Sequence, residues 1–408
     1  MQVSIPTTQR SRALEFGIYR DGDNNLDMSQ SLTVAQAVQS SRTDSAVEYT
    51  VEDTTGLRVD GDDVVEGRKR TDNFTITDGK IGDEQIGKAR NMASESNLAQ
   101  FVAQTLDNAE KSGAKQAWID LVDHGGGDGG GLETHTGAVM SMPDMAKAIG
   151  DGVALHTKEH PEDANRTIDG VVANQCLMST MGFADALSRV GVRWLAASPE
   201  TMLSPGVPTG VADAIARNMN DPAGMACGVV DTVMRTRYDD PSGESFGTAA
   251  AFDVLDCSPD KVANAEKAIK AFNDATAADT SDRSAIRRDV ASIQGMVRFP
   301  DATPDMPWHA DRPAIAVYTS VASDPSLPTQ LRTDARAAAD ATRALVMAHK
   351  ESRGFGPFDG SSYADAVGPT IHVPLAPKQI DPWAPKISET NNAFYDGVDE
   401  AKFVRAVA

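Results

Sequence analysis

The hydrophobic and polar positions of this chain alternate in blocks that predict strands and helices in turn. Short apolar runs predict strands at residues 13–19, 46–51, 116–123, 168–175, 192–197 and 248–255. Apolar residues at helical intervals predict helices at residues 28–39, 98–111, 142–149, 178–189, 211–235 and 260–277. Strands that alternate with helices form a mainly parallel sheet with helices on both faces. The pattern therefore predicts an α/β fold.

Two regions depart from this alternation. Residues 56–83 alternate polar and apolar positions between Gly and Asp turns, which predicts hairpins. After about residue 300, Pro-rich segments surround an Ala-rich helix at 333–348 and a strand at 370–374. We therefore expect a main domain over residues 1–300 and a C-terminal extension over residues 301–408 that packs on the same domain.

Two of the predicted strands end in residues that can carry chemistry. The run 116–123 ends in His124 and three glycines, and the run 168–175 ends in Cys176. The carboxyl ends of neighbouring parallel strands converge on one crevice. A thiol and an imidazole placed there are a nucleophile and a general acid/base. The sequence thus predicts a cysteine hydrolase, whereas Cys227 and Cys257 lie in apolar stretches and are expected to be core thiols.

The charge and composition of the chain limit the classes of molecule that it is expected to bind. The 408-residue chain has a net charge of −21, which repels nucleic acid and anionic membranes. No apolar stretch approaches the roughly twenty residues of a membrane helix, and the first residues lack the layout of a signal peptide. We expect protein or peptide substrates, no nucleic-acid partner and no membrane insertion. The expected location is the cytoplasm, unless a signal has been removed.

Several segments resemble the clostripain-like cysteine peptidases, which have a caspase-like fold. The resemblance is carried by residues 19–27, 91–98, 123–127, 174–180 and 196–200, above all by the His-Gly pair at 124 and the Cys-Leu-Met run at 176. It implies a cysteine endopeptidase with a Cys176/His124 dyad. Cys176 would attack the scissile carbonyl, His124 would carry the proton, and the amides of Gly125 and Cys176 would bind the oxyanion.

The resemblance also implies cleavage after Arg or Lys, through acidic groups in the pocket for the residue before the cut. The family commonly carries Asp-Ala-Cys at the nucleophile, but here Asn174 and Gln175 precede the cysteine. One carboxylate is therefore missing, and Glu200 is our candidate to replace it. Asn174 and Glu200 are the predicted substrate-binding residues.

The loop after the first strand raises the question of calcium. Asp21, Asp23 and Asp27 repeat hard oxygen ligands along it, but the loop is not an EF-hand, because Leu26 stands where that motif needs glycine and Leu32 where it needs Glu. The more favoured interpretation is that its polar side chains border the active site and cap turns. We expect that no cofactor is required and keep calcium at this loop as an alternative.

Two other functions remain open. The His-Gly-Gly-Gly run and a G-x-S-x-G match at Ser245 are typical of serine esterases, although this serine precedes a strand instead of following one. The second open function is that of a binding or regulatory protein, which would keep the caspase-like fold but have impaired turnover. His135, His156 and His160 are expected on exposed loops, and no HExxH or Cys/His cluster indicates zinc.

Overall fold

The structure, a computed structural model, describes residues 12–30, 32–43, 46–60, 63–202, 206–237, 250–278, 282–296, 310–352, 363–375 and 393–407. Most of its strands form one large sheet. These strands are β1 (Leu14–Asp21), β2 (Val47–Asp60), β3 (Asp63–Thr77), β4 (Lys80–Lys88), β5 (Gln116–Val122), β6 (Gly170–Asn174), β7 (Trp194–Ala197), β8 (Ala250–Asp256) and β10 (Val346–Ser352). A second, small sheet pairs β9 (Asp311–Pro313) with β11 (Thr370–His372).

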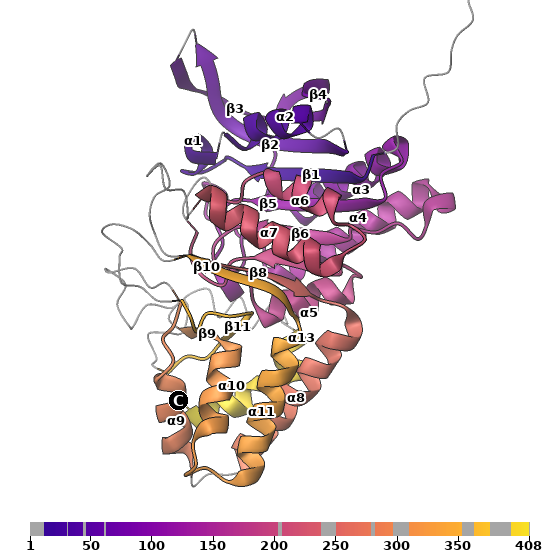
Figure 1. The fold of residues 1–408 in the computed structure, drawn as a ribbon. Helices are drawn as coiled ribbons and strands as arrows, with labels where there is room; N and C mark the ends of the chain where they lie inside the picture. Colours follow the sequence, from indigo (N-terminus) through magenta and orange to yellow (C-terminus); the bar gives the residue numbers. More distant parts are fainter. Residues whose placement is uncertain are drawn as a thin grey trace, which may run out of the picture.

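The order of strands in the large sheet is β10-β8-β7-β6-β5-β1-β2-β3-β4 (Figure 1). Its centre is parallel, because β1 pairs in parallel with β2 and β5, and β6 with β5 and β7. Antiparallel strands continue it at both edges, β3 and β4 beyond β2, and β8 and β10 beyond β7. The predicted α/β fold with a mainly parallel sheet is confirmed. The hairpins predicted at 56–83 are also present, as one edge of that sheet.

Helices cover both faces of the sheet, as predicted. On one face lie α2 (Leu32–Thr43), α6 (Gly210–Arg217) and α7 (Pro222–Arg237), and on the other lie α3 (Glu95–Ser112), α4 (Met142–Glu159) and α5 (Met181–Arg189). Short helices are α1 (Asp27–Gln30), η1 (Gly127–Gly129) and η2 (Pro161–Asp163). The two hydrophobic cores hold the sheet between the helical layers, and no helix in the described part of the chain is long and apolar enough to cross a membrane.

The C-terminal part forms a group of helices beside the β10 edge of the sheet (Figure 1). It contains α8 (Pro259–Ala278), α9 (Arg283–Ala291), α10 (Ala314–Ser323), α11 (Thr329–Arg343), α13 (Ala393–Gly397) and α14 (Glu400–Val407). Phe272 packs against Tyr318 and Phe403, which joins three of these helices. Residues beyond 301 also supply β10 to the large sheet, and the domain boundary near residue 300 stays a prediction.

Some predicted helices differ from the observed ones. The single helix predicted over residues 211–235 is divided into α6 and α7, because residues 218–221 are not helical. The helix predicted over residues 142–149 continues to Glu159, because Gly152 serves close packing and does not end the helix. A Cβ at Gly152 would lie 2.5 Å from the Cβ of Val102 and 2.6 Å from the carbonyl oxygen of Ala99, both on α3. The helix predicted over 333–348 ends at Arg343, since the following residues pair with β8 as strand β10.

Two predictions of burial were wrong. Cys227 was expected in the core but is exposed on α7, whereas Cys257 is buried as expected. His156 was expected on an exposed loop but is fully buried, because the longer α4 carries it beneath α3. Burial along a helix depends on what packs against each side, which the spacing of apolar residues indicates only in part.

Candidate active site

His124 and Cys176 lie beyond the ends of two neighbouring strands. Val122, the last residue of β5, pairs with Asn174, the last residue of β6, and each candidate follows two residues later. The two strands are adjacent and parallel, as the sequence predicted, so their ends open on the same side of the sheet. A cavity of about 220 Å³ lies there, lined by Leu26, Gln30, Asp123, His124, Asn174, Gln175, Cys176, Thr201, Met202 and Gly206.

The two loops that carry the pair touch each other directly. A Cβ at Gly125 would lie 2.2 Å from the carbonyl oxygen of Cys176 and 2.9 Å from its nitrogen, so only glycine permits this approach. The side-chain amide of Gln175 donates a hydrogen bond to the carbonyl of His124 (3.0 Å). Neither the Gly125 nor the Cys176 amide N–H has an acceptor among the described residues. Two amides without an acceptor among the described residues therefore lie where the two loops meet.

The imidazole of His124 is held by an amide from the loop after β1. Its Nε2 lies 2.7 Å from Oδ1 of Asn25. The neighbouring Asn24 donates from its side chain to Oδ1 of Asp123 (2.5 Å) and to the carbonyl of Glu133 (2.7 Å), which anchors this loop to the residues around His124. Burial lowers the pKa of His124, and the charge of Glu133 opposes this only in part. The ring is therefore neutral at neutral pH.

The Cys176 thiol is covered by the segment after β7. Sγ accepts a hydrogen bond from the amide of Met202 (3.2 Å) and lies 3.5 Å from its carbonyl oxygen. Burial raises the pKa of the thiol to about 11, and the charges of Glu200 and Asp123 act in the same direction, against the Met202 hydrogen bond. In this arrangement the cysteine is a thiol and not a thiolate.

Asn174, which lines the cavity, forms part of a tight polar arrangement. Its Oδ1 accepts from the amide of Val207 (2.7 Å), while its Nδ2 donates to the Val207 carbonyl (3.3 Å) and to Oδ2 of Asp120 (3.5 Å). A Cβ at Gly206, which has a φ of 76°, would lie 2.1 Å from the Asn174 oxygen. Burial raises the pKa of Asp120 to about 8, and the hydrogen bond from Asn174 opposes this.

Two carboxyl groups lie near the cavity. Glu200 is buried, and its Oε1 accepts from the amide (2.8 Å) and the hydroxyl (3.0 Å) of Thr201, the residue that lines the cavity at this point. Asp123 lines the cavity itself. Burial raises the pKa of Asp123 well above its usual range, and the nearby charge of Asp21 raises it further.

The three carboxylates considered for calcium each have a protein partner, although Oδ2 of Asp21 is buried without a hydrogen bond among the described residues. Asp27 pairs with Arg20 (3.2 Å) and accepts from the Thr55 hydroxyl (2.9 Å). Asp23 pairs with Lys69 and His135, and Asp21 accepts from the Asp23 amide (2.8 Å). With its cationic partners in place, this set does not fit a calcium ion, which needs several oxygens directed at one point. The calcium hypothesis itself stays untested.

Sequence reasoning missed Asn25 and Gln175 as site residues. Residues 20–27 were recognised as a polar loop that borders the site, but spacing gave no sign of which side chain would reach His124. Gln175 was considered only as a change from the family pattern, and its bond to the His124 carbonyl needs the paired register of β5 and β6. Ser245, the esterase candidate, lies outside the described residues.

Three solved structures match the chain over nearly its whole length. No protein-family model and no curated protein matches it. A secreted C11 cysteine protease from Bacteroides thetaiotaomicron, solved with an irreversible peptide inhibitor, covers 95% of this chain and 99% of its own at 13% identity and a TM-score of 0.64. An inactive zymogen C11 protease from Parabacteroides distasonis covers 97% and 99% at 16% identity and a TM-score of 0.60.

The third match is a further structure of a secreted C11 cysteine protease from Bacteroides thetaiotaomicron, with 14% identity and a TM-score of 0.61. It covers 95% of this chain and 99% of its own. At such low identities these matches concern the fold. They confirm the caspase-like architecture that the resemblance predicted.

Proposed function

Because the chain has the fold of the C11 cysteine proteases, we propose that it is a cysteine endopeptidase that uses Cys176 and His124. The observation that carries this proposal is their geometry. The two residues follow paired strands β5 and β6 by the same number of residues and line one cavity of about 220 Å³. A nucleophile and a base on adjacent strand ends can act on one bound carbonyl.

The protonation states suggest how the reaction begins. The Cys176 thiol has a pKa raised to about 11 by burial, and burial lowers the pKa of His124. Both groups are therefore neutral in the resting protein. His124 would accept the thiol proton as Sγ attacks the carbonyl, and would then deliver it to the leaving amine. Water would hydrolyse the resulting thioester.

The amides of Gly125 and Cys176 are the proposed oxyanion donors, since neither has an acceptor among the described residues. Asn25 is proposed as a positioning residue. When Nε2–H of His124 donates to Oδ1 of Asn25, the other nitrogen of the ring, Nδ1, is left unprotonated as the base. A neutral amide orients the ring without holding a proton on it.

We further propose cleavage after Arg or Lys. The chain is strongly acidic, and a buried cationic side chain needs a carboxylate partner. Asn174 lines the cavity and would form part of the pocket wall. Glu200, predicted from the sequence, and Asp123, which lines the cavity, are the two candidate carboxylates. A bound guanidinium would favour the ionised form of either acid.

A positional-scanning peptide library tests both parts of the proposal. Wild type should cleave after Arg or Lys, and Cys176→Ala should cleave nothing. Glu200→Gln and Asp123→Asn, compared at matched concentrations, should identify the carboxylate by a loss of preference for Arg and Lys without loss of all turnover. Wild-type turnover by Cys176→Ala would refute the peptidase, whereas unchanged preference in both acid variants would refute only the proposed specificity.

A caspase-like binding or regulatory protein with impaired turnover is the second candidate. The observation in its favour is the cover over the thiol, since Sγ contacts both the amide and the carbonyl of Met202. A thiol held in this way with a raised pKa is a poor nucleophile. Two results together would favour this alternative. The library peptides would bind without being cleaved, and Cys176 would not be alkylated in their presence.

A further inference from the structure

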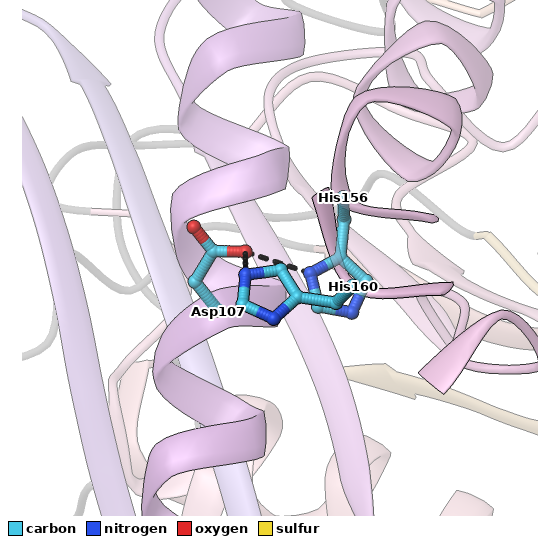
Figure 2. A group of neighbouring side chains, drawn as sticks. All are labelled: Asp107, His156 and His160. Carbon is cyan, nitrogen blue, oxygen red and sulfur yellow. Dashed lines mark hydrogen bonds and ion pairs between the residues drawn. The ribbon is translucent and has the colours of Figure 1, made fainter. Parts of the chain in front are cut away.

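A cluster of metal-ligating side chains lies between α3 and α4, away from the cavity. Figure 2 shows Asp107 on one helix facing His156 and His160 on the other. Oδ1 of Asp107 lies 2.7 Å from Nδ1 of His156 and 3.4 Å from Nε2 of His160. The three ligand atoms all lie within 4.8 Å of one another. His156 is fully buried, whereas Asp107 and His160 are partly exposed.

The spacing follows from the fold. His156 lies in the last turn of α4, and His160 is the residue that caps its carboxyl end, with its amide bonded to the His156 carbonyl. This places the two rings side by side, stacked at 4.9 Å. α3 precedes β5 and α4 precedes β6, and β5 and β6 are parallel, so the last turns of both helices lie at the same end of the sheet. Asp107 is therefore brought beside the two imidazoles by the packing of neighbouring βα units.

Each histidine has a second carboxylate within ion-pair distance of its other ring nitrogen, although Nε2 of His156 makes no hydrogen bond to a described residue. Nδ1 of His160 lies 2.7 Å from Oε2 of Glu110, and Nε2 of His156 lies 3.5 Å from Oδ2 of Asp163. Asp163 is itself held by Arg166. Histidines that bind a metal commonly donate their other N–H to a carboxylate, which sets the tautomer and raises the basicity of the ligating nitrogen.

We propose that Asp107, His156 and His160 bind one divalent transition-metal ion of the zinc class. Two imidazoles and one carboxylate suit such an ion, with water or a neighbouring carboxylate as fourth ligand. Tetrahedral zinc places its ligand atoms about 3.3 Å apart. The Asp107–His160 separation of 3.4 Å already matches, and the Asp107–His156 pair would widen from 2.7 Å.

The charges around the cluster favour a bound cation between Asp107 and the two histidines. Asp107, Glu110, Glu162 and Asp163 surround two imidazoles, and Arg166 offsets only part of this negative charge. His156 and His160 also lie at the carboxyl end of α4, where the helix dipole favours positive charge. A bound ion would join α3 to α4 near the amino ends of β5 and β6, away from the cavity at their carboxyl ends, and would have no part in hydrolysis.

Zinc titration of full-length protein tests this site. The background is Cys176→Ala with Cys227→Ala, so that neither the cavity thiol nor the exposed thiol can hold the metal. After removal of metal with a chelator, competition with a chromophoric zinc indicator should give one bound zinc per chain. His160→Ala and Asp107→Asn should each weaken binding by at least about 100-fold, and Glu110→Gln by about 10- to 100-fold.

The matched control is His135→Ala, which removes an exposed histidine that pairs with Asp23. It should keep the affinity of the background protein, and circular dichroism should show that each variant is folded. Absence of bound zinc in the background protein would overturn the proposal. So would unchanged affinity in both folded variants, His160→Ala and Asp107→Asn. Either result would leave the proposed peptidase function unaffected, because peptide turnover by wild type and by Cys176→Ala is measured without added zinc.

Discussion

His124 and His156 are both held by a polar partner, but the partners differ in charge. His124 meets the neutral amide of Asn25 at 2.7 Å, while His156 meets the carboxylate of Asp107 at the same distance. An amide orients an imidazole without stabilising its charged form, whereas a carboxylate favours a proton or a metal ion on the ring. The contrast separates a ring that can exchange a proton from one suited to hold a cation.

The largest expected effect is the loss of peptide turnover when His124 or Cys176 is replaced. His124→Ala and Cys176→Ala should each lower peptide turnover by roughly 10⁴-fold or more, because base and nucleophile act as a unit. The double variant should be no worse than the worse single one. Steady-state rates on the preferred peptide measure this, with Cys227→Ala as the control that keeps wild-type rates. Additive losses in the double variant would contradict a joint role.

The next effect concerns the contact between the two loops. In Gly125→Ala the new Cβ would meet the Cys176 carbonyl oxygen at 2.2 Å, so the loops must separate and the two amides lose their alignment. We expect kcat to fall by about 10²- to 10³-fold, the usual cost of losing an oxyanion donor. Gly397→Ala, where a Cβ has nothing within 4 Å, should be neutral.

Replacing the amide partner tests the comparison directly. Asn25→Ala should lower kcat by about tenfold or more with little change in KM, since the ring loses its orientation. Asn25→Asp restores an acceptor but adds charge, which raises the pKa of His124. The acid limb of the pH–rate profile should then move to higher pH. An unmoved limb in the Asp variant would show that this contact does not control the ring.

The protonation of the thiol can be followed by alkylation. With its pKa raised to about 11 by burial, the thiolate fraction of Cys176 should grow about tenfold per pH unit between pH 7 and 10. The rate of reaction with iodoacetamide, measured by peptide mass analysis, should rise accordingly. Cys227, which is exposed, serves as the internal reference. A rate that is already constant near pH 7 would mean that an ion pair with His124 forms at rest.

The last expected effect is on stability. Burial raises the pKa of Asp120 to about 8, above the value of about 3.9 in an unfolded chain. The contribution of Asp120 to the free energy of unfolding is therefore fully present below pH 4. It is lost as the pH rises from 4 through 8, by about 1 kcal/mol per pH unit. Asp120→Asn should flatten the decline of Tm between pH 5 and 8. Asp260→Asn, on an exposed position, should leave the decline unchanged.

The local pattern of apolar and polar residues predicted the strands and the positions of His124 and Cys176, because each strand is a buried apolar run that ends in a turn. It could not predict partners that come from other elements. Asn25 reaches His124 from ninety-nine residues away, and His156 meets Asp107 only because α4 continues past Gly152. In the structure that glycine permits the close contact between α4 and α3.

The Asn174 arrangement has a consequence for changing the specificity of this chain by design. An Asp at position 174 would lose the donor to the Val207 carbonyl and would place a second carboxylate against Asp120, 3.5 Å from the present amide nitrogen. The acid that the resemblance predicts at 174 therefore cannot be introduced alone. A paired exchange, Asn174→Asp with Asp120→Asn, would keep one donor and one acceptor at this contact. In lineages of this chain, the two positions should change together.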